Sequence, residues 1–433
     1  MMNIKATKFS FRLAVVLVAL FALRLAYGLC SEFWFPDELQ VYLIGLKFYA
    51  TGHIPCFGAD VVYTETQIPG ALQGLLVGLP FYLFKIPEAP FILLNILSFA
   101  VLCFFALYLQ KKFPGVPTWF TWIWLMTCPW TMNFSTHVLN PSYVLFGSVL
   151  FFIAFFEVIP RISIGFVKPR LAFFLMGFAL FWVLQLHMSW VLLIPFICYA
   201  FWVSFRRDRM VVIYFFAGCL IVAITLIPTL LAWGLSAFSA GAGNTVFNGS
   251  NIKEIGTVLL RFVSFATFEI PRFIDTDGSS KWLFFKDYWP AAPFILLVIL
   301  AGFLQVAYLI VAFFLKNPQA DFAFAKWITL GAMLITWGSF FFSVKGPSSH
   351  TFYVLFPLVM IYSFYCWQPL FRRQWFAVIM AVLLISGLIT HGTLAYHNYS
   401  LKSMYLNRDL PLKAIQEKDY HILGERRAFD KNP

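Results

Sequence analysis

Residues 31–72 read SEFWFPDELQVYLIGLKFYATGHIPCFGADVVYTETQIPGAL and begin where the first long apolar run of the chain, 13–34, comes to its end. Pro36 suits the first turn of a helix, and Asp37 and Glu38 are favourable at the positive end of that helix. The mainly apolar residues that follow predict a helix that lies along the membrane face and ends near Gly52. Acidic residues at a helix start also serve as ordinary caps, so this pattern alone leaves capping and catalysis open.

The position of these acids favours catalysis. Acidic residues are scarce, yet five of the 19 fall within this stretch: Glu32, Asp37, Glu38, Asp60 and Glu65. They directly follow an apolar run that is long enough to span a bilayer, so we expect them at the outer membrane surface. A carboxylate there can meet a lipid-borne substrate and take a proton from an attacking hydroxyl, as a general base.

Composition places the whole chain in a membrane. Of its 433 residues, 61% are hydrophobic and 12% are charged, whereas an ordinary soluble domain carries about 25% charged residues. This excludes a soluble globular protein and a disordered one. The net charge of +12 is explained most simply by Lys and Arg in short cytoplasmic loops.

Apolar runs predict an all-α, polytopic helical membrane protein with about eleven transmembrane helices. The runs are 13–34, 88–109, 116–136, 141–159, 170–186, 188–204, 210–233, 291–315, 326–343, 352–371 and 375–396. Lys and Arg gather in alternate loops, at 5–12, 111–112, 161–170, 206–209, 316–326 and 372–373. We therefore expect a cytoplasmic N-terminus, with the active site and the C-terminus on the outer, periplasmic side of the inner membrane.

This topology divides the chain into four parts. Residues 1–233 form a catalytic membrane module with a first outer loop at 35–87, and 234–290 form a second outer loop that could act as a lid. Residues 291–396 are C-terminal spans, and 397–433 are a short outer tail. Residues 70–85 are apolar but short, so we expect an interfacial or re-entrant helix there. Arg24, within the first span, is expected to snorkel or to pair with an internal acid.

The first outer loop carries an ordered set of motifs. They are the Asp37–Glu38 pair after the first span, an amphipathic helix, Thr51-Gly52-x-x-Pro55, Tyr63-x-Glu65, and a short apolar helix that ends in Phe84-Lys85. This arrangement resembles the GT-C superfamily of membrane glycosyltransferases. Within it, residues 30–90 are most similar to the bacterial branch of the lipid A aminoarabinose transferase and relatives of protein O-mannosyltransferases. Members of that branch often have a Lys directly after the Tyr-x-Glu motif, where it meets the carrier phosphate; Thr66 stands there in this chain.

The resemblance implies a GT-C-like fold and an inverting transfer of a hexose or pentose without a covalent enzyme intermediate. The donor would be a polyprenyl-phosphate-linked sugar, and the acceptor an envelope glycan, lipid or protein. Asp37 would be the general base and Glu38 its partner, with Glu65 and Tyr63 from the second motif in the site. Some members of the superfamily use a divalent metal ion, for which Asp37, Glu65 and His137 are a candidate ligand set.

Further polar residues fall at the predicted outer ends of later spans, where we expect them to contact substrate: His137, Asn140, Gln185, His187, Lys345, His350 and Tyr353. Lys345 and His350, with the hydroxyls beside them, suit a phosphate or pyrophosphate. Each position also has a structural interpretation. Asn140 before Pro141 reads as a helix cap, His187 as a residue exposed at the interface, and the turn around His350 as a solvated loop.

Two other classes of function share the same composition. A transporter or flippase of a lipid-linked sugar should show repeat symmetry and spans broken near the bilayer centre. An envelope glycan polymerase or ligase usually works through arginines in outer loops, and Arg261 and Arg272 are candidates for that chemistry. Because the acids lie at one membrane face, the sequence favours the glycosyltransferase.

Overall fold

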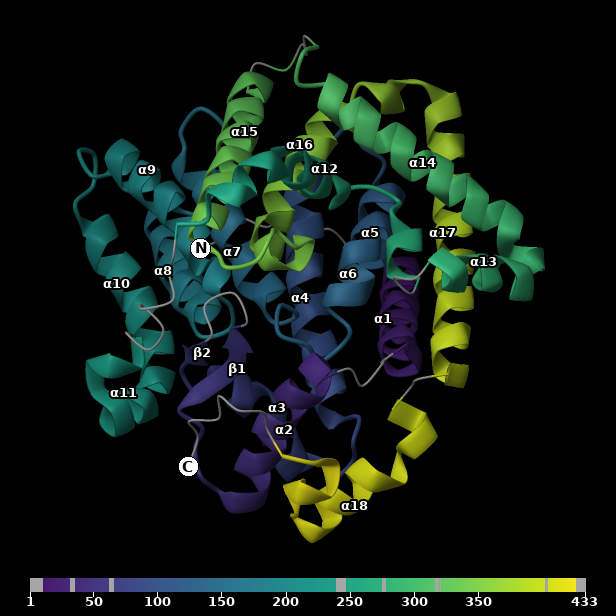
Figure 1. Ribbon diagram of the computed structural model, residues 1–433. Helices are drawn as coiled ribbons and strands as arrows, with labels where there is room; N and C mark the ends of the chain where they lie inside the picture. The colour runs from purple at the N-terminus through teal and green to yellow at the C-terminus, as the bar shows by residue number, and fades with distance from the viewer. Residues whose placement is uncertain are drawn as a thin grey trace.

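The computed structural model describes residues 11–31, 36–61, 66–238, 247–274, 278–315, 319, 321–401 and 404–425. This part of the chain is a bundle of helices with one small antiparallel sheet (Figure 1). Seven of its helices are long and apolar enough to cross a membrane, and four shorter apolar helices accompany them. The all-α, polytopic prediction is therefore confirmed.

Each predicted span coincides with one helix or with consecutive helical segments. The single helices are α1 (Phe11–Ser31), α4 (Ala89–Lys112), α7 (Val144–Val158), α8 (Pro169–Leu184), α14 (Ala292–Val311), α15 (Phe322–Ser339) and α17 (Gln374–Leu401). The composite spans are α5 (Thr118–Thr127) with α6 (Pro129–Phe134), η1 (Met188–Leu193) with α9 (Ile194–Ser204), α10 (Met210–Ala223) with η2 (Ile224–Leu226) and α11 (Ile227–Trp233), and η9 (Ser349–Leu355) with α16 (Phe356–Trp367). Most of the composite spans are interrupted next to a proline, which has no N–H to continue the helix.

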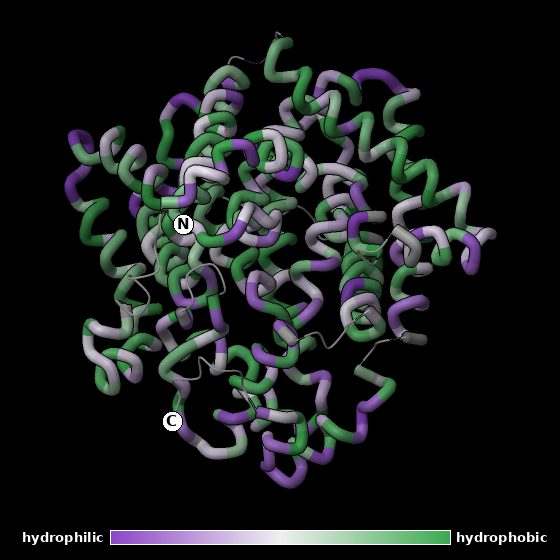
Figure 2. Tube along the Cα trace, viewed as in Figure 1, coloured by the Kyte–Doolittle hydropathy of each residue, from purple (hydrophilic) through white to green (hydrophobic). Residues whose placement is uncertain are grey.

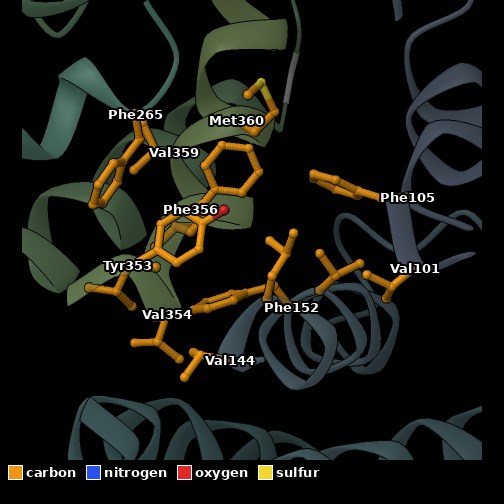
Figure 3. Close-up of a cluster of buried hydrophobic side chains, with 14 of the residues drawn as sticks. Val101, Phe105, Val144, Phe152, Phe265, Tyr353, Val354, Phe356, Val359 and Met360 are labelled. Carbon is orange, nitrogen blue, oxygen red and sulfur yellow. The ribbon is translucent and has the colours of Figure 1, made fainter. Parts of the chain in front are cut away.

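The hydrophobic core joins α4 and α7 to the pair η9–α16 (Figure 3). Phe152 on α7 and Phe356 on α16 are fully buried in it. Phe265, just after α12 (Ile255–Ser264), enters the same cluster, so the second outer loop is packed into the body of the protein. The other labelled members are Val101, Phe105, Val144, Tyr353, Val354, Val359 and Met360.

The loops that carry the basic residues meet at one end of the bundle, which we call the basic-loop end. Lys112 Nζ donates to the carbonyl oxygen of Ile162 at 2.7 Å and lies 3.5 Å from a carboxylate oxygen of Asp321. Arg170 pairs with Asp208 at 2.7 Å. These contacts connect four predicted cytoplasmic loops. Figure 2 shows hydrophilic residues at such turns and along α18 (Asp409–Glu417), with hydrophobic helices between them.

The first loop is a compact unit of α2 (Pro36–Thr51), β1 (Phe57–Val61), β2 (Thr66–Pro69) and α3 (Leu72–Leu83). The strands pair antiparallel, with Asp60 opposite Gln67. The 12 residues of α3 span about 18 Å at 1.5 Å per residue, too little for a hydrocarbon core of about 30 Å. This agrees with the expectation that residues 70–85 do not cross the membrane.

Helix α2 is present where predicted, but it is enclosed rather than laid along a surface. Its residues from Gln40 to Leu46 are buried on every side. A Cβ added to Gly78 of α3 would lie 2.5 Å from the carbonyl oxygen of Gly45, so the α2–α3 crossing needs glycine. Close backbone approach at small residues is the common way to pack apolar helices in membranes.

The C-terminal segment closes over this loop. It contains η11 (Met404–Asn407), α18 (Asp409–Glu417) and η12 (Tyr420–Leu423). Arg408 donates to both carboxylate oxygens of Glu88, at 2.6 and 3.1 Å. The ammonium group of Lys418 lies 5.3 Å from the centre of the Tyr49 ring on α2. The tail is thus part of the first-loop unit, although it is too short to fold alone.

The predicted second outer loop forms short helices, of which α12 packs against α14 and α15 (Figure 1). The short helices are η3 (Gly234–Phe238), η5 (Gly249–Glu254), α12, η6 (Ile270–Phe273), α13 (Gly278–Asp287) and η7 (Trp289–Ala291). Asn251 donates to the carbonyl oxygen of Phe340 at 2.8 Å, and Val258 and Phe262 are fully buried. Its function as a lid stays a prediction, as do the proposed boundaries of the four parts.

Candidate functional site

The carboxylates of Asp37 and Glu38 occupy the first turn of α2. Asp37 is exposed and Glu38 is half-buried. Both lie at the end of the helix where the peptide N–H groups and the helix dipole favour negative charge. Asp37 is therefore an accessible, stabilised anion at the end of the bundle opposite the basic loops, which we call the site end.

His350 is where the separate elements of the site meet. Its Nδ1 lies 2.9 Å from the hydroxyl oxygen of Ser348, and its ring stacks on Phe134 with the centroids 6.3 Å apart. Asp37 and Arg272 are the charged groups that act electrostatically on this ring. The predicted base from α2 thus lies near the predicted anion-binding turn before α16.

A second imidazole, that of His187, lies near His350, which acts on it electrostatically. The His187 Nδ1 accepts the backbone N–H of Ser189 at 3.1 Å and therefore carries no proton in the neutral ring. Burial, together with the neighbouring His350, lowers the pKa of His187 to about 3. His187 is therefore neutral at pH 7 and has an N–H at Nε2. It is buried, not exposed at the interface as one interpretation of the sequence had it.

Arg272 is the residue that our sequence reasoning did not place in this site. It lies on η6 and is half-buried, with its guanidinium carbon 5.3 Å from the centre of the Trp130 ring. Glu269 pairs instead with Arg261, and no carboxylate of the described residues forms an ion pair with Arg272. Burial lowers the pKa of Arg272, as does the charge of Arg261, while Glu269 opposes them. In the sequence it was only an arginine in an outer loop.

Three buried oxygens at the site end have no hydrogen-bond partner among the described residues. They are Asn140 Oδ1, Ser142 Oγ and Ser349 Oγ. The cap interpretation of Asn140 is wrong, because α7 begins only at Val144 and residues 139–144 form turns before it. Buried polar atoms without a partner are rare in folded proteins, and a bound ligand is one explanation.

Two predicted substrate contacts are already used by the protein itself. The imidazole of His137 lies 2.7 Å from Ser31 Oγ and 2.6 Å from the carbonyl oxygen of Asn133, and burial lowers its pKa to about 4. The Gln185 amide accepts from Thr225 at 2.8 Å and donates to the carbonyl oxygen of Val222 at 3.0 Å. Substrate binding by these two residues stays a prediction, and their observed contacts hold helices together.

The remaining predicted residues are dispersed. Tyr353 is fully buried in the aromatic cluster below the site, with its ring stacked on Trp130 at 6.3 Å. Lys345 is exposed, and its carbonyl oxygen accepts from Asn251 at 3.2 Å. Tyr63 and Glu65 lie outside the described residues, so the candidate ligand set with Asp37 and His137 is not tested. The described residues contain no group of three or more His, Cys, Asp or Glu that could hold a metal ion.

The fold and the site together define a class of protein: a polytopic helical membrane protein with a carboxylate, imidazoles and a guanidinium at one end of its bundle. No protein-family model and no curated protein matches the sequence. Among solved structures, the chain is similar to the crystal structure of ArnT from Cupriavidus metallidurans bound to undecaprenyl phosphate. The identity is 12%, the match covers 96% of this chain and 78% of that one, and the TM-score is 0.50. The chain therefore shares the overall fold of that structure, as the resemblance predicted.

Proposed function

We propose that this protein is an inverting glycosyltransferase that moves a hexose or pentose from a polyprenyl-phosphate carrier to an envelope acceptor. The observation that carries the proposal is the placement of Arg272 and His350 on the stacked rings of Trp130 and Phe134, with Asp37 near enough to act electrostatically on His350. The fold supports it too, because the similar ArnT structure holds undecaprenyl phosphate. We place the reaction at the outer face of the inner membrane, opposite the basic-loop end, with a cytoplasmic N-terminus.

The chemistry assigns one step to each group. Asp37 removes the proton from the acceptor hydroxyl, and the resulting oxygen nucleophile attacks the anomeric carbon of the sugar. The bond between that carbon and the phosphate oxygen breaks on the opposite face. The polyprenyl phosphate then leaves with one additional negative charge, which Arg272 stabilises by a charge-assisted hydrogen bond. The neutral Nε2–H of His187 is a further donor for this phosphate or for the sugar.

Arg272 can also replace the lysine that is missing at position 66, where this chain has a threonine. The related enzymes often have a lysine at that position, and this chain has none. A guanidinium from the second outer loop supplies the positive charge in its place. Glu38 is the partner of Asp37 in the first turn of α2, and the roles of Glu65, Tyr63 and Lys345 remain part of this proposal.

The test is mass spectrometry of envelope glycans from a deletion strain, complemented with the wild type or with Asp37→Asn. Asp37→Asn keeps the shape of the side chain and removes the base, so one sugar should be lost in the deletion and stay absent in this variant. Asp208→Asn is the matched control at the basic-loop end and should restore the sugar. Full restoration by Asp37→Asn at equal protein level would overturn the mechanism and favour a transporter or a polymerase.

A further inference from the structure

Arg24 lies inside α1 and is fully buried. Its guanidinium donates to the carbonyl oxygens of Met126 at 2.8 Å, Thr131 at 3.3 Å and Ser135 at 3.4 Å. It also donates to the hydroxyl oxygens of Ser135 at 2.9 Å and Ser98 at 3.3 Å. No carboxylate among the described residues pairs with it. The side chain therefore neither snorkels nor finds an internal acid, contrary to both sequence expectations.

These carbonyls lie at the end of α5 and at the end of α6, where the helical hydrogen-bond pattern stops. Helix α5 ends at Thr127, its C-cap residue Cys128 has an extended ψ of 136°, and Pro129 starts α6 without an N–H to donate; α6 in turn ends at Phe134, just before Ser135. Such a break leaves carbonyl oxygens without their intrahelical partners, which is costly inside a membrane. The planar guanidinium has five donors, whereas the ammonium group of a lysine has three on a single nitrogen and cannot reach all of these acceptors.

Two further contacts hold α6 to the same face of α1. The hydroxyl of Tyr27 donates to Asn133 Oδ1 at 2.7 Å, and Ser31 contacts His137 at 2.7 Å. A Cβ added to Gly28 would lie 2.5 Å from the carbonyl oxygen of Thr136, so the two segments are in direct backbone contact. The six residues of α6 are thus fixed by α1 along two turns.

The aromatic residues of α6 form the base of the proposed site. The Trp130 ring lies under the guanidinium of Arg272, and Trp130 stacks on Phe134 with centroids 5.2 Å apart. Phe134 in turn stacks on His350. Arg272 and His350 are the two groups that we assign to the site in addition to Asp37. Both therefore lie against Trp130 and Phe134, the two aromatic side chains of α6, and Arg24 holds the backbone of α6 in place.

We propose that Arg24 is a positioning residue that acts through α6 to set the place of Arg272 and His350. This inference rests on the proposed function, because it concerns the anion that Arg272 would bind. Arg24 does not touch that anion. It fixes the carbonyl of Met126 before α6 and those of Thr131 and Ser135 within and just after it, and α6 fixes the orientation of Trp130 and Phe134.

The experiment measures binding of undecaprenyl phosphate to the purified protein in detergent, by native mass spectrometry. Arg24→Lys keeps the positive charge and loses most of the carbonyl contacts, and we expect it to weaken binding about tenfold, which corresponds to about 1.4 kcal/mol. Ser135→Ala removes one of the five contacts and should weaken binding less, which gives a second variant if Arg24→Lys is poorly folded. Arg170→Lys, at the basic-loop end, is the control and should bind as the wild type does.

A double-mutant cycle separates positioning from a general loss of structure. If Arg24 acts through Arg272, then Arg24→Lys combined with Arg272→Lys should bind no more weakly than Arg272→Lys alone. Additive losses, or wild-type binding by both Arg24→Lys and Ser135→Ala, would overturn the inference. If the wild type itself does not bind undecaprenyl phosphate, the proposed function fails instead, and the two failures are distinguishable.

Discussion

The carboxylate of Glu157 at the basic-loop end and the polar groups of the candidate site differ in their hydrogen-bond partners. The buried carboxylate of Glu157 finds its partners within the protein: it accepts from Ser163 Oγ and from the backbone N–H groups of Ile164, Phe166 and Val167, at 2.7 to 3.5 Å. At the site end, the Asn140, Ser142 and Ser349 oxygens and the Arg272 guanidinium have no such partner among the described residues.

The presence or absence of partners within the chain distinguishes polar groups that stabilise the fold from polar groups that are free to bind a ligand. A buried charged group whose hydrogen-bonding positions are all occupied by its own chain has none free to bind a substrate. A buried polar atom without a partner costs free energy, so it persists where another requirement maintains it. Mutations at the basic-loop end should therefore change stability, whereas mutations at the site end should change activity or binding.

The largest expected effect is at the site end. Arg272→Met should lower the transfer rate about 10²- to 10³-fold, because a preorganised donor to the developing phosphate charge is lost. The thermal unfolding temperature in detergent should stay close to that of the wild type. The rate is measured with purified protein and the donor that glycan analysis identifies. Equal losses of rate and of stability would place Arg272 with the structural groups instead.

The converse change is Glu157→Gln at the basic-loop end. The amide presents an NH₂ group to backbone N–H donors, which should destabilise the protein by about 1–3 kcal/mol. Thermal unfolding in detergent measures this loss, and the activity per folded molecule should be unchanged. A variant with normal stability and low activity would contradict the proposed division between the two ends.

Low pH should destabilise the protein through the histidines at the site end. None of the seven histidines falls in the basic loops, and the pKa values of His137 and His187 are lowered to about 4 and about 3. Since the unfolded chain binds more protons than the folded one between about pH 4 and pH 6.5, stability should fall as the pH is lowered through this window. Unfolding temperatures at pH 7.5 and pH 5 test this. His137→Gln should flatten part of the dependence, and a pH-independent wild type would refute it.

Asn140→Ala is the smallest expected change. The variant removes an oxygen that the described residues leave without a partner, so stability should change by less than about 0.5 kcal/mol. If a substrate hydroxyl or amide binds that oxygen, the KM for donor or acceptor should rise about threefold to tenfold. Unchanged KM values for both substrates would remove Asn140 from the site.

The sequence predicted the bundle because each span is a continuous apolar run and the loop charges alternate. It also predicted Asp37 and the turn at His350, since both lie beside a span end. It named Arg272 only as a candidate for a polymerase or ligase and could not place it beside His350, because its contact with Trp130 joins distant parts of the chain. It misassigned Arg24 for the same reason: the carbonyls that accept from the guanidinium lie between residues 126 and 135, about a hundred residues away.

The pair between Glu88 and Arg408 has a consequence for biosynthesis. The two residues are separated by 320 positions, so at about 5–20 residues per second roughly 16 to 64 seconds pass between their translation. The Asp37 helix is therefore made early but receives this support only after Arg408 has been translated. A truncated product that stops before Arg408 would carry the membrane helices α1 to α17 and still lack a closed first loop. Synthesis of the segment around Arg408 is thus a late step in the maturation of the N-terminal carboxylate.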